Sequence, residues 1–189
     1  MRRYFAFLRA INVGGHTVTM ENLHKLCDSF GLSDVKTFIA SGNLIFQSTE
    51  PNATALELKI ASGLQGALGY EVATFIRSEA ELTQIASYQA FPQSDLDAAA
   101  AFNIAFLAVS LDNEARDKLA ALTTGIDRFV SHGREIYWLC QKKQSESTFS
   151  NAVLEKTLGM KSTLRGANTI RKLAAKYATK SKNNRGTAF

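Results

Sequence analysis

Residues 4–30, YFAFLRAINVGGHTVTMENLHKLCDSF, decide the fold, because they place a strand, a glycine loop and a helix one after another. Tyr4–Ala10 is apolar at both alternating sets of positions, which predicts a central strand covered on both faces. In Met20–Phe30 apolar residues recur at i, i+3, i+4 and i+7 behind Thr19 as an N-cap, which predicts a helix. The rest of the chain therefore has to supply a sheet and the layers that cover it.

The residues that follow complete a split β-α-β pattern. A turn signal, ASGN, separates two short apolar strands, and a second helix ends near Gly69. Ser78 and Glu81 have the spacing of a capping box that opens a third helix. The order β-α-β-β-α-β predicts a ferredoxin-like plait, in which the sheet order is 4-1-3-2. The elements predicted after the first helix are strands at 35–39 and 43–47, a helix at 56–68, a strand at 72–76 and a helix that follows Ser78.

The same order of elements recurs in the second half of the chain. Arg77 and Arg165 each stand before a helix and are followed by apolar residues at +5, +8 and +9. The predicted fold class is therefore α+β, a duplicated ferredoxin-like (split βαβ) plait with two antiparallel sheets and helices. We expect a first half at 3–90, a linker at 91–102, a second half at 103–178 and a basic flexible tail at 179–189. The elements predicted for the second half lie at 103–109, 112–122, 128–132, 135–139, 151–158, 162–164 and 168–177.

The composition is that of a globular protein with a basic end. Of the 189 residues, 46% are hydrophobic and 21% are charged. No apolar run approaches the ~20 residues that span a bilayer, and Arg9 interrupts the first run too early for a signal peptide. We therefore expect a cytoplasmic protein with no membrane partner and with both cysteines as buried thiols. Residues 165–189 carry seven basic residues and no acidic one, whereas residues 1–164 have a net charge of −2.

The plait topology predicts what the glycine loop faces. The first and third strands are antiparallel neighbours, so the end of the first strand lies beside the turn between the second and third. Paired glycines let backbone amides turn toward a ligand, and the N-terminus of the next helix favours an anion. We expect a small-anion or phosphate pocket there, with Arg9 as counter-charge. The expected ligand-binding residues are Arg9, Asn12, Gly14, Gly15, Ser41, Gly42 and Asn43.

A purely conformational interpretation of these residues stays open. Glycines in loops usually serve a turn, and Ser-Gly-Asn is an ordinary hairpin sequence. The second half offers a comparison, because its equivalent loop, VSLDNE, contains no glycine. A fold that needed glycine only for the turn would need it twice, which favours a function for the first loop.

Four segments give the chain a resemblance to a known family. LRAINVGG, the following M..L..L...FG, V.T.IASGN..F and the late T.R..NT..KL resemble the bacterial domain of unknown function 1697 (DUF1697) family over residues 3–176. The resemblance implies a duplicated ferredoxin-like plait in a small bacterial cytoplasmic protein, and it implies no established activity. All seven expected ligand-binding residues match the first motifs. Two departures stand out: Ala10 replaces a glycine, and Gly166-Ala167 replace an Asn-Trp pair after Arg165.

Other functions compete with an anion-binding module. An enzyme acting on a phosphorylated metabolite held by Arg9 is one alternative, with no catalytic residue identified. RNA-recognition domains stack bases on the strand aromatics of this plait, but aromatics on central strands more often belong to a core.

The three histidines lack metal-ligand spacing, so we expect no metal and no cofactor. A second chain, as in a homodimer, is one candidate cover for the open sheet face. Nucleic-acid binding through the basic C-terminal helix and tail would use Arg165, Arg171, Lys172, Lys176, Lys180 and Lys182.

Overall fold

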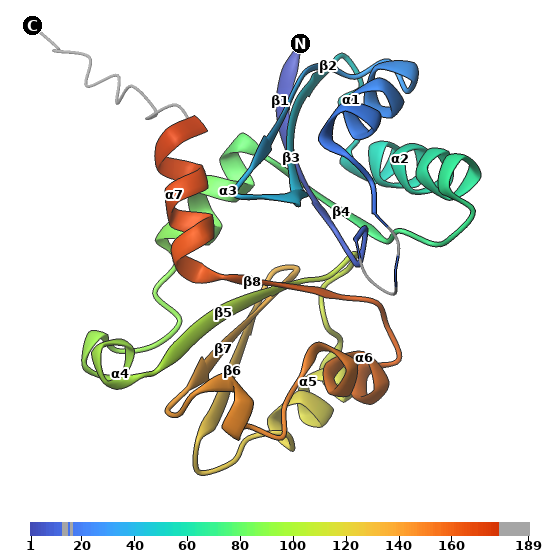
Figure 1. The fold of residues 1–189 in the computed structure, drawn as a ribbon. Helices are drawn as coiled ribbons and strands as arrows, with labels where there is room; N and C mark the ends of the chain where they lie inside the picture. The colour runs from blue at the N-terminus through green and yellow to red at the C-terminus, as the bar shows by residue number, and fades with distance from the viewer. Residues whose placement is uncertain (13–14, 16, 178–189) are drawn as a thin grey trace, which may run out of the picture.

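Four antiparallel strands from the N-terminal part of the chain form the first sheet, in the order β2-β3-β1-β4 (Figure 1). The computed structural model describes residues 1–12, 15 and 17–177. The observed order is the predicted order of a ferredoxin-like plait, in which the first and third strands pair in the middle. The elements of this half are β1 (Arg2–Leu8), α1 (Met20–Ser29), β2 (Ser33–Phe38), β3 (Ala40–Ser48), α2 (Ala53–Leu68), β4 (Thr74–Ser78) and α3 (Glu79–Ser87).

A second sheet repeats this topology in the order β6-β7-β5-β8. The repeat confirms the duplicated α+β plait. Between the halves lies α4 (Gln93–Ala98), where no element was predicted, because six residues are too few to show a helical period. The elements of the second half are β5 (Ala101–Phe106), α5 (Asn113–Ala120), β6 (Asp127–His132), β7 (Glu135–Cys140), a 3-10 turn (Gln144–Glu146), α6 (Asn151–Leu158), β8 (Thr163–Gly166) and α7 (Ala167–Tyr177).

The apolar core forms three layers, and the middle one joins the two sheets. In β1, Tyr4, Ala6 and Leu8 pack under α1 and α2, whereas Phe5 and Phe7 face the second half. The middle layer contains residues of both sheets together with α3 and α7, and the Phe7 and Phe106 rings stack there with their centroids 4.0 Å apart. The outer layer of the second half lies under α5 and α6 (Figure 1). The open face of each sheet is therefore covered by the other half of the same chain.

Local sequence signals position most of the element ends. Thr19 Oγ1 accepts a hydrogen bond from Asn22 N, and Ser78 and Glu81 form both bonds of the predicted capping box. Gly69 ends α2 in the left-handed conformation, with φ at +80°. The first strand, however, ends at Leu8 rather than Ala10, because Ala10 has a φ of +58° and turns the chain out of the sheet.

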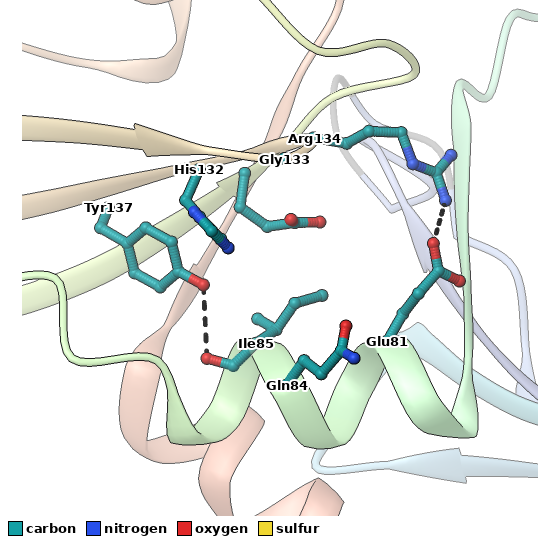
Figure 2. Close-up of a pocket in the computed structure, with 8 residues that line it drawn as sticks. Glu81, Gln84, Ile85, His132, Gly133, Arg134 and Tyr137 are labelled. Atoms are coloured by element: carbon teal, nitrogen blue, oxygen red, sulfur yellow. Dashed lines mark hydrogen bonds and ion pairs between the residues drawn. The ribbon is translucent and has the colours of Figure 1, made fainter.

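The helix α3 lies across the turn between β6 and β7 (Figure 2). A cavity of about 170 Å³ separates the helix from this turn.

Within the described residues, no helix is long and apolar enough to cross a membrane.

Candidate functional site

Arg9 lies directly after β1 and reaches into the second half. Its Nε and Nη2 atoms each donate to one carboxylate oxygen of Glu155 on α6, both at 2.6 Å. The arginine side chain is 30% exposed and the glutamate side chain 14% exposed, so the pair is partly shielded from water. Glu155 Oε1 also accepts from Ser162 N. The guanidinium of Arg9, the predicted counter-charge for an anion, is thus in bidentate geometry. Its partner in this structure is the Glu155 carboxylate of the same chain.

The loop after Arg9 is fastened at both ends. Asn12 Oδ1 accepts a hydrogen bond from Val18 N at 2.7 Å, and the Tyr70 hydroxyl donates to Ile11 O at 2.7 Å. Gly15 has a φ of +86°, and an added Cβ would meet no atom of the described residues within 4 Å, so its glycine serves the backbone conformation. Gly14 of the predicted site lies outside the described residues, as do Val13 and His16.

The hairpin part of the predicted site contacts Arg165 of the second half. Arg165 Nε donates to Asn43 Oδ1 at 2.5 Å, and its Nη2 donates to Gly42 O and Leu8 O, both at 2.9 Å. A Cβ added to Gly42 would lie 3.0 Å from this Nη2, so a side chain there would push the arginine away. Ser41 lies on β3. Asn43 is 3% exposed, and its hydrogen bonds lead to protein atoms.

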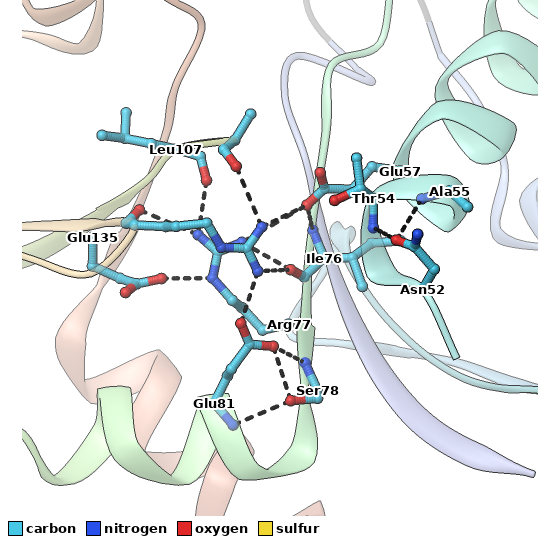
Figure 3. A network of polar contacts seen from close by, with 12 residues as sticks. Asn52, Thr54, Ala55, Glu57, Ile76, Arg77, Ser78, Glu81, Leu107 and Glu135 are labelled. Atoms are coloured by element: carbon cyan, nitrogen blue, oxygen red, sulfur yellow. Dashed lines mark hydrogen bonds and ion pairs between the residues drawn. The ribbon is translucent and has the colours of Figure 1, made fainter. Parts of the chain in front are cut away.

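The first half sends an equivalent arginine in the opposite direction. Arg77 Nη2 donates to Leu107 O at 2.8 Å and to Arg134 O at 3.2 Å, and its Nε donates to Glu135 Oε1 at 2.5 Å (Figure 3). Leu107 follows β5 as Leu8 ends β1, and Glu135 opens β7 at the turn that corresponds to Gly42-Asn43. Each half therefore supplies an arginine that donates to a carbonyl group at a strand end of the other half. This exchange explains why Arg77 and Arg165 recur at equivalent positions in the sequence.

Carboxylates surround the buried Arg77. Glu57 on α2 is 7% exposed; its Oε1 accepts from Ile76 N at 2.7 Å and lies 3.4 Å from Arg134 Nη1. Burial raises the pKa of the Glu57 carboxyl, against the opposing effects of Arg134 and Arg77. Arg134 Nη2 also donates to Glu81 Oε1 at 2.8 Å. The network contains three carboxylates and two guanidinium groups, and it joins α2, α3, β4 and the turn before β7 (Figure 3).

The acidic partners in these networks were not predicted from the sequence. Glu57 did leave a signal, because it lies three and seven residues before Ile60 and Leu64 on the apolar face of its helix. Glu155 and Glu135 left none, since their arginines come from the other half of the chain.

The predicted basic surface divides into two groups. Arg165 turns inward, and burial lowers its pKa to about 10. Arg171, Lys172 and Lys176 are exposed on α7, where the Arg171 guanidinium lies 5.6 Å from the Phe102 ring centroid. Lys180 and Lys182 lie outside the described residues.

The strand aromatics considered for base stacking are buried. Phe5, Phe7 and Phe46 each have 0% exposure, the first two in the layer between the halves and the third under α1 and α2. Within residues 1–12, 15 and 17–177, no group of three or more His, Cys, Asp or Glu side chains is arranged to hold a metal ion.

A second hollow lies beside the Arg9–Glu155 pair, at the end of α6. Its volume is about 360 Å³. Lys161, one of its lining residues, has its Nζ 3.4 Å from Glu71 Oε2 of the first half. The lining residues are Ala152, Glu155, Lys156, Gly159, Met160 and Lys161.

Comparisons with known proteins agree on fold and family. The chain is similar to a solved structure, the conserved bacterial protein SP0830 from Streptococcus pneumoniae. The TM-score is 0.73 at 23% sequence identity, over 93% of this chain and 98% of that chain, a likeness that concerns the fold. No curated protein matches. The model of a family described as a protein of unknown function (DUF1697) matches residues 1–137. Since this match covers more than half of the sequence, the chain belongs to the DUF1697 family.

Proposed function

We propose that the protein is a non-catalytic binding module for a small anion, phosphate or a phosphorylated metabolite, held at Arg9 and the loop of residues 12–18. The observation that carries this proposal is the bidentate pair between Arg9 and Glu155. A guanidinium in this geometry recognises planar carboxylates and phosphate oxygens alike. Glu155 accordingly occupies the position that a ligand oxyanion would take.

The charges around the pair support an anion. Lys156 and Lys161 line the hollow beside Glu155, and Glu71 partners the second lysine. With Arg9 these groups amount to three cations and two carboxylates, so the surroundings are net positive once an anion has displaced Glu155. Gly42 and Asn43 keep a supporting role in this proposal, because their contacts with Arg165 fix the sheet edge from which Arg9 extends.

Thermal unfolding tests the proposal directly. Sodium phosphate should raise the midpoint more than sodium chloride of equal ionic strength, since a ligand that binds only the folded state stabilises it by mass action. Glu155→Gln should increase this phosphate-specific shift: the amide leaves the Arg9 fork free of a competing charge and can still accept from Ser162 N. Arg9→Ala and Gly15→Val should remove the shift while the protein stays folded.

Arg128→Ala is the matched control, because Arg128 forms a comparable 2.6 Å pair with Asp95 elsewhere on the surface. Its phosphate response should equal that of the unaltered chain. Equal responses to phosphate and chloride in both the unaltered chain and the Glu155→Gln variant would rule the proposal out.

Nucleic-acid binding through α7 is the second proposal, resting on the exposed Arg171, Lys172 and Lys176. Fluorescence anisotropy with labelled single-stranded RNA and duplex DNA should show affinity that falls steeply with salt, because phosphate contacts release counterions. Replacing both lysines by glutamine should flatten this dependence. Salt-insensitive binding, or no binding at low salt, would contradict it.

A further inference from the structure

The cavity under α3 is large enough for one small organic group. Its volume is about 170 Å³, and a cavity of about 150 Å³ in another protein is known to hold one benzene ring. Figure 2 shows Glu81 and Gln84 reaching toward it from the helix, with His132 and Tyr137 on the opposite side. The lining residues are Glu81, Gln84, Ile85, His132, Gly133, Arg134, Glu135 and Tyr137.

Several polar groups of this cavity already have partners. Glu81 accepts from Arg134 and from Ser78, and the Tyr137 hydroxyl donates to Ile85 O at 3.4 Å. Arg134 donates in addition to Ile76 O at 3.1 Å. These groups form the wall of the cavity and leave little capacity for a ligand.

Glu135 is different, because only one of its oxygens is used. Its side chain is 7% exposed, and Oε1 holds Arg77. Among the described residues, none donates a hydrogen bond to Oε2. Glu135 lines the cavity, so this oxygen is open to a donor that enters it. A ligand in the cavity can bind this open oxygen without breaking an existing hydrogen bond.

The groups beside Glu135 add acceptors. His132 is its direct partner across the β6–β7 turn, so the two side chains share one face of the sheet. The His132 ring stacks on Tyr88, with a centroid distance of 4.0 Å and an interplanar angle of 13°. The Gln84 side chain is exposed at the rim. A ligand would therefore meet a carboxylate, an imidazole and an amide.

The charged groups around the cavity favour a cation as the ligand. Glu57, Glu81 and Glu135 face Arg77 and Arg134, which leaves this network one negative charge in excess when all five groups are ionised. An added anion would be repelled by the two carboxylates of the cavity. A cation with N–H donors would satisfy Glu135 Oε2 and neutralise the excess charge.

We propose that the cavity between α3 and the β6–β7 turn binds a small organic cation, a primary ammonium group on a short carbon chain. The ammonium donates to Glu135 Oε2, and the chain packs on Ile85. This site is separate from the anion site at Arg9, and neither proposal depends on the other.

Amide spectra of the full chain, titrated with n-butylammonium chloride, test the site. We expect saturable shifts confined to residues 84–85 and 131–137, and no such shifts with n-butanol or sodium butyrate, which match the probe in length and differ in charge. Sodium phosphate should leave these signals in place, which separates this site from the one at Arg9.

Three variants make the outcome decisive. Gln84→Phe fills the cavity from an exposed helix position and leaves the Arg77–Glu135 pair intact, so affinity for n-butylammonium should fall at least tenfold. Thr83→Phe, at the neighbouring exposed position outside the lining, should bind as the unaltered chain does. Glu135→Gln should also lose affinity, in a protein whose spectrum shows that it is folded. Equal shifts with n-butanol and n-butylammonium, or unchanged affinity in Gln84→Phe, would overturn the proposal.

Discussion

Backbone strain concentrates at the sheet edge where Arg9 and the β2–β3 turn meet. Ala10 and Ile39 both adopt positive φ angles, +58° and +64°, which L-residues with a Cβ rarely occupy. Ile39 is also 70% exposed, so no packing explains its conformation. The resemblance to DUF1697 proteins gave glycine as the usual residue at position 10. The alanine here keeps the left-handed backbone and accepts the strain.

Ala10→Gly should therefore stabilise the protein. Removing the Cβ relieves a left-handed strain of roughly 1–2 kcal/mol, from which the greater freedom of glycine in the unfolded chain subtracts about 0.4–1 kcal/mol. We expect a net gain of about 0.5–1 kcal/mol in the free energy of unfolding, measured by urea denaturation. Ala121→Gly is the control, because Ala121 has an ordinary φ of −65°, and it should lose stability. A loss in Ala10→Gly would contradict the strain argument.

The contact partners of the candidate-site residues could not be predicted from the sequence. Gly42 was predicted as part of a hairpin and of the ligand site, and no sequence pattern showed that the Arg165 guanidinium, 123 residues away, packs against it. Asn43, which was predicted to bind a ligand, accepts a hydrogen bond from the same arginine. The Arg9 position was predictable from topology, whereas its partner Glu155 was not, because no local pattern links α6 to the end of β1.

At the scale of elements, the local signals were sufficient. The order of strands and helices, the N-cap at Thr19 and the capping box of α3 follow from short-range spacing, and the structure shows each of them. The exceptions were short or strained. The six residues of α4 show no period, and the early end of β1 reflects the backbone of Ala10.

The capping box of α3 also supports the polar network between the halves, since Glu81 joins Ser78 to Arg134. Ser78→Ala should lower the free energy of unfolding by about 1 kcal/mol, as for the loss of an N-cap, in a urea titration followed by circular dichroism. Ser87→Ala, at the other end of the same helix, should change stability little, because Ser87 only donates back to Thr83 O and Gln84 O. Equal effects at both ends would argue against the capping role.

At the scale of the whole molecule, one apolar layer belongs to both halves. Phe7 and Phe106 stack in it, one from each central strand, and both have 0% exposure. Two plaits that merely followed each other along the chain would each have to cover an open sheet face in another way. The shared layer predicts that the halves unfold together.

A double-mutant cycle on Phe7→Leu and Phe106→Leu tests this coupling. Since the rings touch, the double variant should be less destabilised than the sum of the single variants, by about 0.5–1.5 kcal/mol. Phe7→Leu combined with Phe149→Leu should be additive, because Phe149 lies in the separate layer under α5 and α6. Additive effects for Phe7 and Phe106 would show that the two sheets do not share a core.

The exchanged arginines make the contacts between the halves resemble those of a two-fold symmetric dimer. In such an interface residue i of one subunit meets residue j of the other, and j meets i. Arg77 reaching Leu107 and Arg165 reaching Leu8 follow this rule within a single polypeptide. The two halves are arranged like the subunits of a symmetric dimer but belong to one chain, so their association is independent of protein concentration. The two halves differ at the ends where these contacts form, because the first carries the glycine loop and the second carries the buried Glu135.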